Sequence, residues 1–289
     1  MSERIIAGVR LSNPDKILYP DQGITKGALA EHYQAVADHM LPHVARRPLT
    51  LLRCPSGQET KCFYQRHAGS GVPDQLKSIA VPGFEEPFLY IEDAGGLIAM
   101  VQMGVLELHP WGVTVDRPDR PDRIIFDLDP GEGLPFKAIV QAAREVRDRL
   151  QKLGLRSFAK TTGGKGRHVV VPIRAARPWA EVKQFAKTLS EKMAADAPDR
   201  FLTRVAKAER SGRIFIDYLR NDPASTAVGP YSTRARSGAP VALPLDWKQV
   251  RDGLDPAAFT LATIPALIRK RKVDPWAEMT RLAQDLPGN

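Results

Sequence analysis

Apolar residues recur at helical spacing in several stretches of the chain. The clearest stretch runs from residue 136 to residue 153, and Gly154 follows it as a stop. Another begins after Thr25, a residue able to cap a helix, and ends near Pro42, while others begin at Asp93 and at Pro178. These patterns predict four helices, each with one face against a core.

Short apolar runs between these helices predict β-strands. They cover residues 48–53, 88–91, 105–108, 123–128, 157–160, 168–173 and 214–219. From Ser237 the chain is richer in proline, so we expect a tail that wraps the surface and ends in a short helix near 277–283. Strand hairpins mixed with crossing helices indicate an α+β fold rather than a regular βαβ alternation.

Composition places the chain among ordinary folded proteins and suggests an anionic partner. It has 289 residues, 43% of them hydrophobic and 26% charged, which excludes a disordered protein. Lys and Arg number 42 against 33 acidic residues, and nucleic acid is the commonest partner of such a basic chain. No apolar run is long enough to span a membrane, and we expect a soluble, cytoplasmic protein.

Three acidic residues follow or lie within apolar strands. Asp127 and Asp129 are two residues apart, so a strand would place both carboxylates on one face, roughly 6–7 Å apart at the backbone. Asp217 lies in a further apolar strand, where a lone carboxylate is costly to bury. A divalent cation such as Mg²⁺ or Mn²⁺ would balance these charges. A turn in which the acids cap a helix or are solvated is the alternative.

A glycine-rich loop joins two of the predicted strands. Its sequence, TTGGKGRH from Thr161 to His168, lets backbone N–H groups turn toward an anion, with Lys165 and Arg167 beside them. The spacing is not that of a Walker A loop, and a strand rather than a helix follows. The loop therefore predicts a phosphate contact, with a flexible hairpin of solvated charges as the alternative.

Three ordered segments together carry a family resemblance. They are FDLDPGEG, TTGGKGRHVVVP and FIDYLRND…TAVGPYSTRAR, and the likeness extends from LSNPDKILYP to PLDW. They resemble the polymerase domain of bacterial ligase D, a member of the archaeo-eukaryotic primase superfamily that serves in non-homologous end joining. The resemblance implies a primase-type α+β core with a mixed or antiparallel sheet flanked by helices, and a single domain over residues 1–289.

The resemblance also implies a division of labour along this domain. Residues 1–110 would contact a DNA 5′-phosphate and the template, residues 111–240 would hold metal and nucleotide, and residues 241–289 would form the C-terminal wrap. Two divalent ions, Mn²⁺ or Mg²⁺, would bind the catalytic Asp127, Asp129 and Asp217. Thr162 stands where the family motif has serine, and both carry a hydroxyl. The nucleotide-binding residues implied are Arg53, His109, Thr162, Gly163, Gly164, Lys165, His168, Arg220 and Arg234.

DNA recognition is implied at two further places. Asn13, Lys16 and Lys26 match the family's 5′-phosphate site, although each lysine taken alone is better explained as a solvated surface residue. Phe63 and Tyr64 match an aromatic pair that stacks on the template base. We expect one member of this pair to pack in the core.

The expected function is templated addition of nucleotides, with ribonucleotides preferred, to a DNA 3′-OH at gaps or broken ends. The alternatives are a primase that starts chains de novo and a DNA-end-binding module without catalysis. The partners would be a gapped or broken duplex with a 5′-phosphate, NTP or dNTP, a Ku-like protein and a DNA ligase, with no membrane, and the site of action would be the bacterial nucleoid.

Other features of the sequence give weaker indications of function. Cys54 and Cys62 could form one disulfide, but a domain of this size needs none and two cysteines fit a reducing compartment. With His67 they do not show the spacing of a zinc finger. The four tryptophans are expected to pack rather than to stack on bases, and the basic run at 269–272 is expected to be a solvated face.

Overall fold

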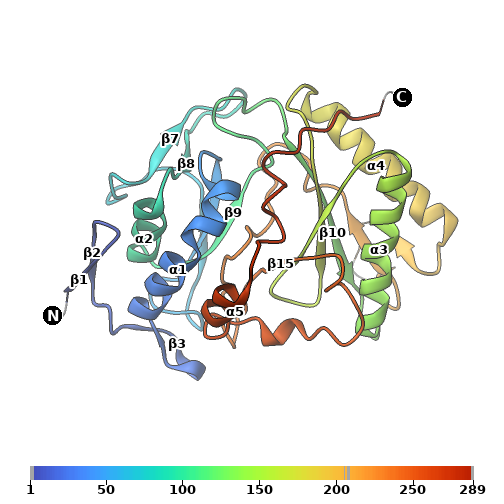
Figure 1. The fold of residues 1–289 in the computed structure, drawn as a ribbon. Coiled ribbons are helices and arrows are strands. Elements are labelled where there is room, and N and C mark those ends of the chain that lie inside the picture. Colours follow the sequence, from blue (N-terminus) through green and yellow to red (C-terminus); the bar gives the residue numbers. More distant parts are fainter. Residues whose placement is uncertain (1–2, 205, 207–208, 288–289) are drawn as a thin grey trace.

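The computed structural model describes residues 3–204, 206 and 209–287 (Figure 1). Its helices are α1 (Lys26–Val44), α2 (Ala94–Gln102), α3 (Phe136–Lys152), α4 (Trp179–Asp196) and α5 (Ile264–Lys270). The strands before residue 111 are β1 (Glu3–Ile6), β2 (Val9–Ser12), β3 (Ile17–Tyr19), β4 (Ile24–Thr25), β5 (Leu49–Arg53), β6 (Phe63–Gln65), β7 (Lys77–Ile79), β8 (Phe88–Tyr90) and β9 (Val105–Pro110). The later strands are β10 (Arg123–Pro130), β11 (Phe158–Thr161), β12 (Arg167–Pro172), β13 (Phe201–Leu202), β14 (Ile214–Asp217) and β15 (Pro244–Leu245).

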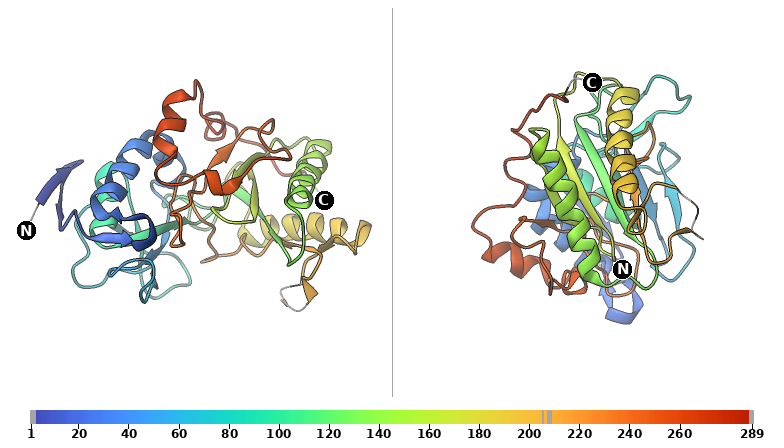
Figure 2. Two further views of the ribbon diagram at one scale, coloured as in Figure 1. Left: turned by 90° about the horizontal axis from the view of Figure 1, so that it is seen from below. Right: turned by 90° about the vertical axis from the view of Figure 1, so that its right-hand side faces the viewer.

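A six-stranded sheet organises the C-terminal half. Its order is β13-β14-β10-β12-β11-β15, and every pair is antiparallel except β13 with β14. Helices α3 and α4 cover one face, as the right-hand view of Figure 2 shows, and the other face is turned toward the N-terminal half. The expected α+β fold with a mixed sheet flanked by helices is confirmed.

The N-terminal half is built on a smaller sheet, β6-β5-β9, with α1 and α2 packed beside it. Both helices begin as their sequences predict: the Thr25 hydroxyl accepts from the Ala28 N–H at 3.2 Å, and the Asp93 carboxylate accepts from the Gly96 N–H at 3.0 Å. Pro42 does not end α1, which continues to Val44. One continuous set of buried apolar side chains extends through both halves, so the two sheets share a core.

The C-terminal tail differs from expectation. Residues 275–281 form turns, and the last helix is α5, about ten residues earlier. The tail also enters the core instead of only wrapping the surface, because β15 is an edge strand of the large sheet and Trp276 is buried with its indole N–H bonded to the Ala159 carbonyl at 3.0 Å. The proline in the first turn of α5 is compatible with the start of a helix. The segment is too short for the spacing of its apolar residues to predict that helix.

Cys54 and Cys62 form a disulfide that closes the loop between β5 and β6. Both sulfurs are thereby bonded to each other, which excludes the zinc site with His67 in this structure. No helix in the described part of the chain is both long and apolar enough to cross a membrane.

Candidate functional site

A cavity of about 740 Å³ lies between the two halves of the molecule. The ends of β10 and β12 and the glycine loop form one side, and β9 and β6 contribute the other. Basic and acidic side chains dominate the lining, which includes Tyr64, Arg66, His109, Asp127, Asp129, Thr162, Gly164, Lys165, His168, Arg210, Arg220, Arg234 and Arg236. Most residues expected to bind nucleotide or metal therefore meet in one place.

Strand pairing sets four polar residues in one row across the large sheet. Lys160 on β11 is paired with His168 on β12, His168 with Asp127 on β10, and Asp127 with Asp217 on β14. Directly paired residues face the same side of a sheet, so all four face away from α3 and α4. Asp129 lies two residues beyond Asp127 on the same face, as the spacing predicts.

The three acids form an electronegative group with the guanidinium of Arg220 inside it and the charge of Arg210 nearby. Arg220 Nε lies 3.1 Å from a carboxylate oxygen of Asp217 and 3.4 Å from one of Asp127. Burial and the charge of Asp127 raise the pKa of Asp129 to about 6, and burial also raises the pKa of Asp217. Both shifts arise mainly from burial, which disfavours the ionised carboxylate, and the charge of Asp127 adds to each.

These donors suit a hard divalent cation in their chemistry. All are carboxylate oxygens, and Asp127 Oδ1 is buried without a hydrogen-bond partner, 3.2 Å from His168 Nε2. As the described side chains stand, however, no three His, Cys, Asp or Glu residues converge closely enough to enclose a metal ion. Arg220 would have to withdraw for the acids to converge on one.

His168 and Lys160 are buried in the floor of the site. Burial and the nearby Lys160 charge lower the pKa of His168 to about 4, so its imidazole is neutral at physiological pH. Burial likewise lowers the pKa of Lys160 well below its usual value, and the Nζ of Lys160 donates to the Thr161 carbonyl at 3.3 Å. Lys160 was not expected from the sequence, because its place in the row depends on the pairing of β11 with β12.

The glycine loop fits closely against its neighbours. A side chain on Gly163 would place its Cβ 2.5 Å from Arg234 Cγ, and one on Gly166 would lie 2.9 Å from the Leu128 carbonyl oxygen. Gly163 also has a φ of +68°, which favours glycine. Lys165 is exposed on the cavity side, whereas Arg167 points to the opposite face of the sheet and lies over the Phe136 ring of α3. Arg167 therefore adds no charge to the loop's anion site.

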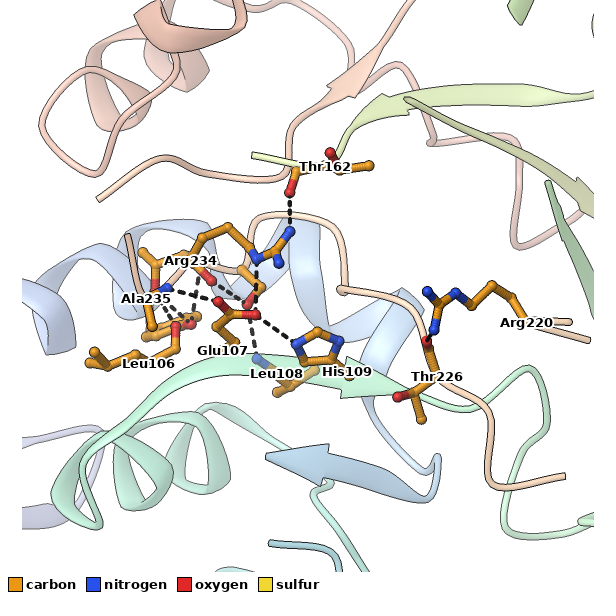
Figure 3. A network of polar contacts seen from close by, with 12 residues as sticks. Leu106, Glu107, Leu108, His109, Thr162, Arg220, Thr226, Arg234 and Ala235 are labelled. Atoms are coloured by element: carbon orange, nitrogen blue, oxygen red, sulfur yellow. Dashed lines mark hydrogen bonds and ion pairs between the residues drawn. The ribbon is translucent and has the colours of Figure 1, made fainter. Parts of the chain in front are cut away.

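A buried glutamate, Glu107, organises the opposite wall (Figure 3). Its Oε2 accepts from His109 Nε2 at 2.8 Å and forms an ion pair with Arg234 Nε at 2.9 Å, and its Oε1 accepts from the Ala235 N–H at 2.8 Å. Arg234 also donates to the Thr162 carbonyl. Burial alone would raise the pKa of Glu107, but His109 and Arg234 lower it to about 2, so the carboxylate stays ionised. The sequence offered one overlooked signal: Glu107 and His109 alternate on one strand.

A second cavity, of about 350 Å³, collects the residues expected at a DNA 5′-phosphate. Asn13, Lys16 and Lys26 all line it. Lys26 is buried and donates to the Ser12 carbonyl at 3.0 Å and to Gln102 Oε1 at 2.8 Å. Arg53 also lines this cavity and not the larger one, so the structure does not place it on a triphosphate path.

Phe63 and Tyr64 are both exposed, at 43% and 62%, so the expectation that one of them packs in the core is wrong. Arg53 lies over the Phe63 ring, and Tyr64 meets the His109 ring edge-on at 6.3 Å between centroids. The pair lies on β6, an edge strand with no partner on its outer side in the three-stranded sheet, which leaves both rings accessible.

Known proteins resemble this chain over nearly its whole length. It is 38% identical over 282 residues to the multifunctional non-homologous end joining protein LigD of Pseudomonas aeruginosa, a match that covers 96% of this chain and 33% of that protein. The bifunctional non-homologous end joining protein LigD of Bacillus subtilis is 30% identical over 280 residues, covering 96% of this chain and 45% of the relative. The chain thus spans a third to a half of the length of these curated relatives.

The solved structures and the family profile agree with these relatives. The polymerase domain of Mycobacterium tuberculosis ligase D, solved in complex with DNA, superposes with a TM-score of 0.87 and 29% identity, covering 95% of this chain and 99% of that one. The profile described as "LigD, primase-polymerase domain" matches residues 25–276, a span that contains the acids, the glycine loop and Arg234. The chain belongs to the LigD primase-polymerase domain family.

Proposed function

We propose that this protein is a nucleotidyltransferase that adds nucleotides, directed by a template, to a DNA 3′-OH at gaps or broken ends. The observation that carries the proposal is the row of Asp217, Asp127 and His168 across three paired strands, at the edge of a cavity that the glycine loop also lines. Polymerase chemistry needs acids for metal and cations for phosphates in one place, and this cavity supplies both.

Asp127, Asp129 and Asp217 would hold the divalent ions, Mn²⁺ or Mg²⁺. When bound, such ions lower the pKa of the attacking hydroxyl and balance charge on the phosphates. The protein's own part is to place the reactants: Lys165 and Arg234 contact the triphosphate from the loop side, and Thr162 and Gly164 bring backbone groups near it. The neutral His168 lies 3.2 Å from Asp127 on the neighbouring strand and would contact the nucleotide from there.

DNA would be held at two further points. Asn13, Lys16 and Lys26 bind a downstream 5′-phosphate in the smaller cavity, where Arg53 adds a guanidinium. Phe63 and Tyr64 present exposed rings on which a template base can stack, with each stacked base contributing about 1–3 kcal/mol. The formal net charge of +9 favours contact with the phosphate backbone in general.

Service in end joining is part of the same proposal, because the chain matches only a portion of relatives bearing that name. So are a preference for ribonucleotides, cooperation with a Ku-like protein and a DNA ligase, and a place of action at the bacterial nucleoid. A primase that starts chains de novo would use the same acids and loop. A module that only binds DNA ends would not need three acids beside a neutral histidine.

Primer extension on a gapped duplex with a downstream 5′-phosphate tests the proposal. Wild type is compared with Asp127→Ala plus Asp129→Ala, with NTP or dNTP and with Mn²⁺ or Mg²⁺. Templated extension that is lost in the double variant, with DNA binding retained, is the expected result. Dinucleotide synthesis on an unprimed template would favour the primase, and DNA binding without extension under any condition would favour the end-binding module.

A further inference from the structure

We propose that Glu107 is a positioning residue that fixes both Arg234 and His109 for the incoming nucleotide. The inference rests on the proposed function and deepens it, because it names what holds the nucleotide-binding groups in place. Glu107 contacts Arg234 and His109, and none of its hydrogen bonds or ion pairs with described residues reaches the acids or the glycine loop (Figure 3).

The contacts of Glu107 converge from separate parts of the chain. His109 lies on the same strand, β9, while Arg234 and Ala235 are more than a hundred residues later. Both carboxylate oxygens are engaged, and the residue is only 3% exposed. A buried carboxylate that accepts two hydrogen bonds and pairs with a guanidinium, all within 3 Å, leaves these partners little freedom to reorient.

Arg234 is held at two points by this arrangement. Its Nε faces Glu107 and one terminal nitrogen donates to the Thr162 carbonyl, which follows β11 of the large sheet. Glu107 belongs to β9 of the small sheet, so Arg234 links the two walls of the cavity. Its remaining N–H groups are left for an anion in the cavity that it lines. Gly163 makes room for this crossing, since a side chain there would meet Arg234.

Glu107 also selects the tautomer of His109. Its pKa of about 2 keeps it an acceptor at neutral pH, so the proton of the imidazole must be on Nε2. Burial lowers the pKa of His109, which keeps the ring neutral and leaves Nδ1 as an acceptor. An acceptor on the cavity wall can receive a hydroxyl of the nucleotide sugar, whereas a glutamine in place of Glu107 would permit either tautomer.

The test is steady-state extension of the gapped duplex with six proteins: wild type, Glu107→Gln, Glu107→Asp, Arg234→Ala, the double variant Glu107→Gln plus Arg234→Ala, and Glu145→Gln. Glu145 is the matched control, because it also pairs with two arginines, Arg149 and Arg200, but lies on α3 and outside the cavity. Thermal melting of each protein separates loss of fold from loss of positioning. Glu107→Asp keeps the charge but shortens the side chain by one methylene, which draws the carboxylate away from Arg234 and His109. The same comparison of KM values can therefore be made with Glu107→Asp if Glu107→Gln does not fold.

A positioning role predicts that Glu107→Gln raises the KM for nucleotide by roughly ten-fold or more, with the Kd for DNA unchanged and Glu145→Gln like wild type. It also predicts that Glu107→Gln raises the KM for nucleotide much less in the Arg234→Ala background than in wild type, because Glu107 and Arg234 act through one contact. A nucleotide KM equal to that of wild type, or fully additive effects, would overturn the role of Glu107. Absence of extension by wild type would overturn the proposed function itself.

Discussion

The smaller cavity allows a quantitative prediction for Lys26. An ammonium has three N–H donors, and the Ser12 carbonyl and Gln102 Oε1 take two of those of Lys26. One donor therefore remains for a phosphate in the cavity that Asn13 and Lys16 also line. A charge-assisted hydrogen bond contributes about 1.5–3 kcal/mol, which corresponds to about 10- to 150-fold in Kd.

Lys26→Gln should remove this contribution selectively. The assay is fluorescence anisotropy at fixed salt with two gapped duplexes that differ only in a 5′-phosphate or a 5′-hydroxyl, so that nonspecific contacts cancel in the ratio of the two Kd values. Wild type should favour the phosphate, and Lys26→Gln should lose most of that preference. Lys165→Gln, in the other cavity, should retain it.

The same preference should depend on pH with a definite sign. Burial, reinforced by the charge of Lys16, lowers the pKa of Lys26 to about 8. Free protein therefore loses the ammonium as the pH rises through about 8, and the preference for the phosphate should fall over that range. The reasoning would be refuted by a well-folded Lys26→Gln protein that discriminates the two duplexes as wild type does.

Three further predictions concern stability and template binding. Trp276→Ala should lower the free energy of unfolding by about 3–5 kcal/mol in urea titrations, because the indole is buried and donates to the Ala159 carbonyl. The half-buried Trp247 provides the control, and an effect of Trp276→Ala no larger than that of Trp247→Ala would count against a tail packed in the core. Glu107 has a pKa lowered from 4.5 to about 2, so it stabilises the fold above pH 4.5 and loses about 2 kcal/mol of that by pH 3; urea midpoints of wild type and Glu107→Gln should converge over this range. Tyr64→Ala should weaken binding to templated DNA by about 5- to 150-fold in anisotropy titrations, and equal affinity for wild type and variant would exclude stacking on this ring.

Local sequence patterns predicted four of the five α-helices and seven of the fifteen strands in the described part of the chain. Helix α3 was readable from its amphipathic spacing, α1 and α2 from their caps at Thr25 and Asp93, and β10 from its apolar run. The spacing of Asp127 and Asp129 also fixed their common face, because alternation along a strand is a local property. Segments of two to four residues, such as β13 and β15, were missed because so short a pattern does not distinguish a strand from a loop.

The sequence predicted less well which cavity or which face of the sheet each side chain occupies. Arg53, itself expected to bind nucleotide, lies in the smaller cavity with Lys26. Arg167, adjacent to the expected nucleotide-binding His168, lies beneath the sheet against Phe136. A one-residue step along a strand reverses the face, so a basic residue beside a motif need not share its environment.

The sequence by itself determined the longer helices, the strands that carry the acids and flank the glycine loop, the class of fold, the acidic pair and the glycine loop, since each depends on residues close together in the chain. The tertiary structure decided that Lys160, His168, Asp127 and Asp217 form one row, because only strand pairing sets their register. It also decided that Glu107 meets Arg234 and that Trp276 enters the core. The contacts of Glu107 with Arg234 and of Trp276 with Ala159 join segments more than a hundred residues apart. Their energy depends on burial, which no local sequence pattern predicts.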